Sequence, residues 1–372
     1  MRPNYLRATL AGGLFALLAV GTTPLSGLFA QSSGAQQDQK QQPPVSVPSA
    51  PKDKDQQKTP DQYTITVEVP LVTLDVVVAD DNGNPITGLS KGNFRVSEDG
   101  VPQPITNFST PDAPITCVML LETSTRGGSY THGIPPYMVN AVNWSAVFIS
   151  QLKKNDWLAL AYFDMRAHYD VDFTQDKMAV RDFLATLRVP GFSESNVFDA
   201  VIETLDRLQD VKGRKSILLL ASGIDTFSKH TWDQTQARLK QTDVTIFPVS
   251  VSQFLEVMRD DGLRPGGGNL TFLQADNQMR EIARLTGGSS FFPRFEGEIP
   301  SDMQQIAAML RSQYSLGYMP SNQARDGKYR KIKVEAVGTD GKPLEILNEK
   351  HKKLKLVIYA RQGYTAPKGP VS

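Results

Sequence analysis

The chain has 372 residues and a formal net charge of +1, and 40% of its residues are hydrophobic. At roughly 100–200 residues per domain, this length predicts two domains with additional segments. The hydrophobic content is enough for a buried core, and the nearly balanced charge gives no reason to expect nucleic acid as a partner. Cys117 is the only cysteine, so no internal disulfide forms, and its place in an apolar run predicts a buried core residue.

Residues 1–30 have the composition of an export signal. Arg2 and Arg7 precede the apolar stretch 8–20, and Ala30-Gln31 is a suitable cleavage point after small residues and turn formers. This apolar core is short for a membrane anchor, since a spanning helix needs about 20 apolar residues. We therefore expect a cleaved signal peptide and no membrane span after cleavage, with an uncleaved anchor as the alternative. The protein would then be periplasmic, in the cell envelope or secreted.

Residues 31–62 are predicted to be a disordered linker. They are rich in Gln, Pro, Ser, Lys and Asp and contain no aromatic residue. Such a segment cannot bury enough apolar surface to offset the entropy lost on ordering. The linker would hold the folded part of an exported protein away from a membrane or wall.

Residues 63–112 read as β-strands and form the first part of a predicted β-domain. The stretches "TITVEV" and "VTLDVVV" alternate apolar and polar residues, and "NFRVSED" is a shorter strand. Asn82-Gly83 and Asp99-Gly100 are hairpin signals, because these dipeptides suit tight turns that need positive φ.

Residues 113–314 change to alternating strands and helices. Buried strands are predicted at 117–121, "DWLALAYFD", "KSILLLAS" and "DVTIFPVSV", because these are continuous apolar runs. The shorter "HYDVDFT" alternates and is predicted to be an edge strand, and "SSFFPRF" is predicted to be the last strand of this part. Helices are predicted at 137–153, 176–188, "NVFDAVIETLDRL", "DNQMREIARL" and 303–313. This order predicts an α/β fold with a doubly wound, mostly parallel sheet and helices on both faces.

Residues 315–367 return to strands, at "SLGYMP", "YRKIKVEAV" and "LKLVIYAR". Two or three strands rarely stand alone. We therefore expect them to pair with the strands of residues 63–112 in one all-β domain, a β-sandwich, with the α/β domain inserted between its two parts. Two separate small sheets are the alternative.

Polar residues follow several of the predicted parallel strands directly. Glu122, Asp164 and Ser222 each stand where a strand ends. In doubly wound sheets, ligands bind at the C-terminal strand ends near the point where the strand order reverses. The sequence therefore predicts a binding face at this edge of the sheet.

Eight stretches resemble an exported family related to von Willebrand factor type A (VWA) domains and typical of Acidobacteria. They span nearly all of residues 71–367 and read "LVTLDVVVADDNGNPITGLSKGNFRVSEDG", "CVMLLETS", "NVFDAVIETL", "KSILLLASGIDTFS", "ARLTGGSSFF", "RSQYSLGYMPSN", "ARDGKYRKIKVEA" and "ARQGYTAP". The resemblance implies a Rossmann-like VWA fold and an exported binding module. It says little about the partner.

The resemblance also implies a metal-ion-dependent adhesion site, which in VWA domains has an Asp-x-Ser-x-Ser loop, a later Thr and a later Asp. Oxygen ligands of this kind suit Mg²⁺, which needs near-octahedral geometry. The corresponding positions in this chain are Glu122, Ser124, Arg126, Ser195 and Ser222, with Asp225 three residues beyond the last.

This set departs from the family pattern in ways that weaken a metal site. Glu122 is one methylene longer than Asp, and Arg126 brings a positive charge that only donates hydrogen bonds. We expect a degenerate site, closed by a Glu122–Arg126 ion pair, that binds Mg²⁺ or Mn²⁺ weakly or not at all. The structural alternatives are that Ser195 caps the next helix and that Ser222-Gly223 is a turn.

The sequence does not favour catalysis. None of the four histidines has metal-ligand spacing, and no glycine-rich phosphate loop follows a strand. We therefore expect a non-enzymatic adhesion module that contacts a protein through the upper face of the VWA-like domain. The alternative is a structural envelope component whose β-domain binds polysaccharide or protein. The insertion 253–275 is a candidate contact loop, or a solvated excursion, with apolar residues Phe254, Leu263, Leu270 and Phe272.

Overall fold

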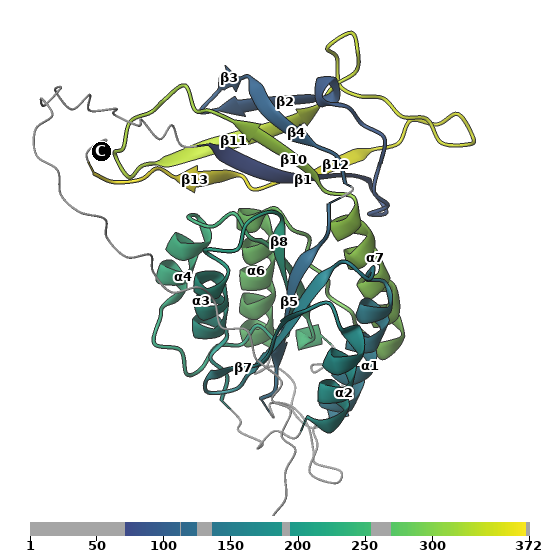
Figure 1. The fold of residues 1–372 in the computed structure, drawn as a ribbon, viewed down its shortest axis with the longest axis vertical. Helices are drawn as coiled ribbons and strands as arrows, with labels where there is room; N and C mark the ends of the chain where they lie inside the picture. The colour runs from purple at the N-terminus through teal and green to yellow at the C-terminus, as the bar shows by residue number, and fades with distance from the viewer. Residues whose placement is uncertain (1–70, 112, 125–135, 188–193, 254–268, 370–372) are drawn as a thin grey trace, which may run out of the picture. The chain divides into compact units, whose positions relative to one another are not determined.

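The computed structural model describes residues 71–111, 113–124, 136–187, 194–253 and 269–369 (Figure 1). These residues belong to one compact unit, Ile65–Ser372. The predicted signal peptide, linker and "TITVEV" strand lie outside the described residues. No helix within the described ranges has the length and apolar character needed to cross a membrane.

A five-stranded sheet has the order β7-β6-β5-β8-β9. Four strands are parallel: β5 (Thr116–Glu122), β6 (Trp157–Phe163), β8 (Lys215–Ala221) and β9 (Thr245–Ser250). β7 (Ala167–Thr174) pairs antiparallel with β6 at the edge, as its alternating sequence predicted. Every residue of β8 is buried, which fits a central strand covered on both faces. The expected mostly parallel α/β sheet is confirmed.

Helices cover both faces of this sheet (Figure 1). One core includes side chains of α1 (Pro136–Ser150), α2 (Lys177–Thr186) and α7 (Ile299–Arg311). The other includes side chains of α3 (Val197–Arg207), α4 (Trp232–Leu239) and α6 (Asn269–Thr286), although α6 also sends Phe272 and Ala275 into the first core.

Two antiparallel four-stranded sheets form a β-sandwich. The first has the order β12 (Leu356–Tyr359), β1 (Val72–Asp80), β10 (Tyr314–Tyr318) and β4 (Ile105–Ser109). The second has the order β13 (Gly363–Thr365), β11 (Tyr329–Ala336), β2 (Phe94–Glu98) and β3 (Val101–Gln103). One cluster of buried side chains from β1, β2, β10 and β11 lies between them. Strands before and after the α/β part therefore pair, and the expected all-β component is confirmed.

Several local predictions were wrong. "SSFFPRF" makes only the isolated bridge between Val249 and Phe291, and the 3₁₀-helix η2 (Glu296–Glu298) follows it. Asn82-Gly83 makes the tight turn that its hairpin signal predicted, with an antiparallel bridge between Ala79 and Pro85, but the turn does not pair β1 with β2, which belong to different sheets with the 3₁₀-helix η1 (Lys91–Asn93) between them. Asp99-Gly100, by contrast, joins β2 to β3 with φ values of 48° and 85°, as the hairpin signal predicted.

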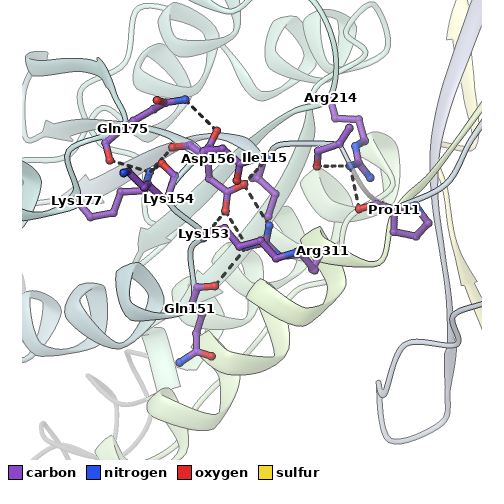
Figure 2. Close-up of polar contacts among 12 residues, drawn as sticks. Pro111, Ile115, Gln151, Lys153, Lys154, Asp156, Gln175, Lys177, Arg214 and Arg311 are labelled. Atoms are coloured by element: carbon purple, nitrogen blue, oxygen red, sulfur yellow. Dashed lines mark hydrogen bonds and ion pairs between the residues drawn. The ribbon is translucent and has the colours of Figure 1, made fainter.

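The chain passes between the parallel sheet and the sandwich twice, and polar side chains bind both passages (Figure 2). The Arg214 guanidinium donates to the carbonyl oxygens of Ala113 at 2.6 Å and Gln313 at 2.5 Å, one in each passage. Asp156, whose side chain is 0% exposed, accepts from the N–H of Ile115 at 2.9 Å and from Arg311 at 2.7 Å. These bonds fix the start of β5 and the end of α7.

Candidate functional site

The C-terminal ends of β5 and β8 lie side by side in the middle of the parallel sheet. The chain leaves β5 through α1 toward β6 on one side, whereas β8 lies on the other side of β5. The strand order therefore reverses between these two strands, which is where doubly wound sheets bind ligands. Glu122 ends β5 and Ser222 follows β8, so the structure brings these two predicted residues together.

Glu122 is buried and uses both carboxylate oxygens within the protein. Oε1 accepts a hydrogen bond from the Ser124 hydroxyl at 2.5 Å, and Oε2 accepts one from the Ser222 backbone N–H at 2.6 Å. The Ser222 hydroxyl oxygen in turn accepts from the N–H of Ile224 at 3.2 Å. Glu122 thus ties the end of β5 to the loop that follows β8.

Ser195 lies in a short strap before α3 that pairs with the same loop. Its carbonyl oxygen accepts from the N–H groups of Thr226 at 2.8 Å and Phe227 at 3.0 Å. Its hydroxyl oxygen is buried and has no hydrogen-bond partner among the described residues. The helix begins at Val197 with Asn196 as its N-cap residue, so the alternative that Ser195 caps the helix is wrong.

Asp225 takes over the role of the missing cap. The Asn196 side chain makes no capping bond, and Asp225 Oδ1 instead accepts from the N–H of Phe198 at 3.3 Å and from the Ser228 hydroxyl at 2.5 Å. Partial burial raises the pKa of the Asp225 carboxyl. Its carboxylate therefore faces the start of α3 and Ser228.

A second tie, between Asp199 and His230, was not predicted from the sequence. Asp199 accepts from the N–H groups of Lys229 at 2.9 Å and His230 at 3.0 Å and lies 2.7 Å from the His230 ring nitrogen Nδ1. Burial opposes its ionisation, but these hydrogen bonds and the ring prevail and lower the pKa of Asp199. The one available sequence signal was an acidic residue in the first turn of a helix.

The end of β6 joins the same network. Asp164 is buried, and its carbonyl oxygen accepts from the N–H of Asn196 at 2.8 Å. The Asn196 side chain donates to the carbonyl oxygen of Met165 at 3.0 Å, while its own amide oxygen has no partner in the described part of the chain. Three strand ends and the start of α3 are thus held by one set of buried polar contacts.

As arranged here, these residues do not fit an octahedral Mg²⁺ site. Glu122 gives both oxygens to protein donors, Asp225 gives Oδ1 to the α3 terminus and Ser228, and the Ser195 hydroxyl is a buried oxygen without a partner among the described residues. Within the described ranges, no three His, Cys, Asp or Glu side chains gather as a metal cluster would. Arg126 lies outside those ranges, so its ion pair with Glu122 stays a prediction, as does weak metal binding.

An apolar groove lies beside this network, between α4 and α6. It has a volume of about 530 Å³ and is lined by Trp232, Leu270 and Leu273, with polar residues Gln274, Asn277, Gln278 and Glu281 along it. Leu270 is 77% exposed and Leu273 is 53% exposed. The Trp232 ring packs on Phe198, the residue whose N–H bonds to Asp225, at 5.5 Å between ring centroids.

The predicted contact segment 253–275 ends in a helix rather than a loop, and its contact with a partner stays a prediction. Leu270 and Phe272 belong to α6, since this helix begins at residue 269 rather than near residue 276. Leu270 faces the groove, whereas Phe272 is buried in the core. Phe254 and Leu263 lie outside the described residues. Trp232 was not singled out because the sequence of α4 is polar and does not indicate a helix, and Leu273 was not because α6 begins earlier than predicted.

No family model matches the chain, and no curated protein is similar to it in sequence. Among solved structures, a VWA protein from Catenulispora acidiphila is 10% identical with a TM-score of 0.40, covering 79% of this chain and 74% of that one. The PilB minor pilin from Streptococcus sanguinis is 14% identical with a TM-score of 0.41, covering 56% of this chain and 63% of that one. The conserved hypothetical protein BatB from Bacteroides thetaiotaomicron is 16% identical with a TM-score of 0.35, covering 53% of this chain and 100% of that one.

The protein from Catenulispora acidiphila is named as a von Willebrand factor type A protein, the family that the sequence resembles. At these identities and TM-scores, the fold assignment rests on the strand order and the two helix layers of the protein itself, and no function is transferred from its structural neighbours.

Proposed function

We propose that the chain is a non-enzymatic binding module that contacts a protein partner at the C-terminal edge of its parallel sheet. The observation that carries this proposal is the groove between α4 and α6, where Trp232, Leu270 and Leu273 line an open hollow. Grouped exposed apolar residues rimmed by polar ones mark interaction sites on soluble proteins. Trp is also among the residues that contribute most to protein–protein binding.

The polar network beside the groove supports a role in positioning rather than in chemistry. The carboxylates of Glu122, Asp199 and Asp225 each accept hydrogen bonds from backbone N–H groups of neighbouring segments. Such bonds hold the loop after β8 and the start of α3 in one conformation. A rigid platform reduces the entropy lost when a partner binds.

The partner is proposed to bind without a bridging metal ion, because both oxygens of Glu122 and Oδ1 of Asp225, at positions of the predicted adhesion site, accept hydrogen bonds within the protein. A titration of the full chain with Mg²⁺ or Mn²⁺ in a thermal-shift assay tests this. We expect no stabilisation at millimolar metal. A ligand at one hundred times its dissociation constant stabilises by about 2.7 kcal/mol, so a rise in Tm of the corresponding size would overturn metal independence.

The partner surface is tested with the substitution Leu273→Asp in the groove and the matched substitution Met178→Asp on α2. Both residues are exposed, at 53% and 56%, but α2 belongs to the opposite helix layer. The immobilised protein is titrated with envelope extract, and captured proteins are quantified by mass spectrometry. Saturable capture of a protein that Leu273→Asp weakens at least tenfold and Met178→Asp leaves intact is the expected result. Equal capture by both variants would contradict the proposed face.

Export is part of the same proposal, as is membership in the exported VWA-related family. Expression in a bacterial host followed by N-terminal sequencing tests the predicted cleavage after Ala30. A mature chain starting at Gln31 in the periplasm or medium is expected. A full-length chain retained in the cytoplasm would contradict export and an envelope location. The proposed binding face would still be tested by the Leu273→Asp variant.

A further inference from the structure

The strand β12 leaves one edge of the sandwich open. It is the outermost strand of its sheet and pairs with β1 through residues 77–80, and no other strand of the described part of the chain pairs with its second edge. An open edge presents unpaired N–H and C=O groups, which can form hydrogen bonds with a further strand.

The other outer strands of the sandwich are less open to such pairing. Beyond β13, the Thr365 N–H donates to the carbonyl oxygen of Lys240 at 2.9 Å. β3 has only three residues and contains Pro102, which has no N–H to donate. The pairing of β4 with β10 shifts register between Gly317 and Tyr318, which makes that edge irregular.

Hollows flank β12 on both of its faces. Leu356 and Ile358 line a hollow of about 360 Å³ together with the aliphatic side chains of Val334, Leu344 and Leu354. Val357 and Tyr359, together with part of Ile358, line a second, more polar hollow of about 260 Å³ beside the end of α6, which also includes Arg280 and Arg284. Because neighbouring residues of a strand point to opposite faces, a strand added beside β12 would place alternate side chains into these two hollows.

Lysines directly precede β12 in the chain. The segment between β11 and β12 folds into hairpins that extend from the sandwich (Figure 1), and its last part reads "KKLKL" before β12 continues. Lys353 and Lys355 are exposed, while Leu354 between them lines the aliphatic hollow. Lys353 pairs with Glu345, but no ion pair of Lys355 occurs among the described residues. Edge lysines repel a second copy of the same strand and attract a strand that carries carboxylates.

We propose that the open edge of β12 binds an extended acidic segment of a partner protein as an additional antiparallel or parallel strand. Its aliphatic side chains would fill the hollow formed by Leu354, Leu356 and Ile358, and its carboxylates would lie opposite Lys355. This mode of recognition takes affinity from main-chain hydrogen bonds and specificity from alternate side chains. The surface is separate from the groove between α4 and α6, so it does not depend on the proposed function above.

The charge preference is tested with two dye-labelled octapeptides, one of alternating Val and Glu and one of alternating Val and Lys. Fluorescence anisotropy is measured as each is titrated with the full chain. We expect saturable binding of the acidic peptide and binding of the basic peptide at least tenfold weaker. Lys355→Glu should weaken the acidic peptide at least tenfold, whereas Lys350→Glu, an exposed lysine at the hairpin turn, should change it less than twofold.

Main-chain pairing is tested with two N-methylated forms of the acidic peptide, one methylated at its odd-numbered residues and one at its even-numbered residues. One of these two forms lacks the N–H groups that would bond to β12, and its affinity should be at least tenfold lower. Hydrogen exchange at residues 356–359 should slow only in the presence of the peptides that bind. Equal affinity for both methylated forms and the parent would overturn strand addition. So would an undiminished affinity of Lys355→Glu, or no saturable binding of the acidic peptide at millimolar concentration.

Discussion

Asp156 shows how one buried carboxylate holds several segments together. Burial would raise its pKa, but the Arg311 guanidinium and the N–H groups of Ile115 and Lys153 prevail and hold the pKa of Asp156 below its ordinary value of 3.8. A carboxyl whose pKa is lower in the folded than in the unfolded protein stabilises the fold at neutral pH. That contribution is lost as the pH falls below about 4 and through the folded-state pKa.

Asp156→Asn is therefore expected to lower the free energy of unfolding by about 3 kcal/mol at pH 7, because Arg311 loses its buried partner. The loss relative to the unsubstituted protein should shrink as the pH approaches 3. Urea denaturation at both pH values measures it. Asp206→Asn is the matched control, since Asp206 is an exposed partner of Arg238 and such pairs contribute about 1 kcal/mol or less. A loss that does not depend on pH would contradict the ionic role of Asp156.

Glu122 bridges two segments at the candidate site, and its loss should destabilise the fold. Glu122→Ala removes the acceptor of the Ser124 hydroxyl and of the buried Ser222 N–H. We expect a loss of about 2–4 kcal/mol in urea denaturation, because a buried donor without a partner costs about 1–3 kcal/mol. Ser124→Ala removes one of these two bonds and leaves the Ser222 N–H satisfied, so it should cost about 1 kcal/mol. Equal losses for the two variants would contradict the bridge between β5 and β8.

At the scale of elements, α3 depends on a cap supplied from a distant loop. Asp225→Ala removes the acceptor of the Phe198 N–H, and the expected loss is about 1 kcal/mol, as for an ordinary N-cap. Asp176→Ala provides the comparison, since Asp176 caps α2 locally through the N–H groups of Met178 and Ala179. Hydrogen exchange should accelerate at the start of α3 in the first variant and at the start of α2 in the second. Unchanged exchange at Phe198 in Asp225→Ala would show that α3 needs no such cap.

The elements that could be predicted from the sequence are those whose pattern is set by burial alone. β5, β8 and β9 are continuous apolar runs because helices cover both of their faces, and β7 alternates because it lies at an edge. α4 escaped prediction because it buries only Thr235 and Leu239 and relies on the Thr231–Gln234 capping box. "SSFFPRF" misled because its aromatic residues suit a strand, although only Phe291 bridges to β9.

The candidate site shows the same division. Glu122 and Ser222 could be placed together because each stands at the C-terminal end of a strand whose neighbours are set by the parallel topology. The role of Asp225 could not, because its bond to Phe198 joins a loop to a helix start 27 residues earlier. The Asp199–His230 contact spans 31 residues and likewise has no local signal. Contacts between loops depend on tertiary structure, which periodicity does not encode.

At the scale of the whole molecule, an inserted α/β part requires the chain to leave the sandwich and return. Arg214 binds both passages through the carbonyl oxygens of Ala113 and Gln313, and it also reaches Pro111 at 3.3 Å. A guanidinium can hold several acceptors at once because its donors form a rigid planar fork. We therefore infer that Arg214 couples the stability of the two passages.

Arg214→Ala should accelerate hydrogen exchange and limited proteolysis at residues 110–115 and 312–314 together, since both passages lose the same donor. Arg214→Lys should give an intermediate result, because an ammonium keeps the charge but not the fork of donors. Arg238→Ala, which breaks an exposed ion pair with Asp206, should leave both passages unchanged. Faster exchange at one passage alone would contradict the coupling, since it would mean that Arg214 supports each passage independently of the other.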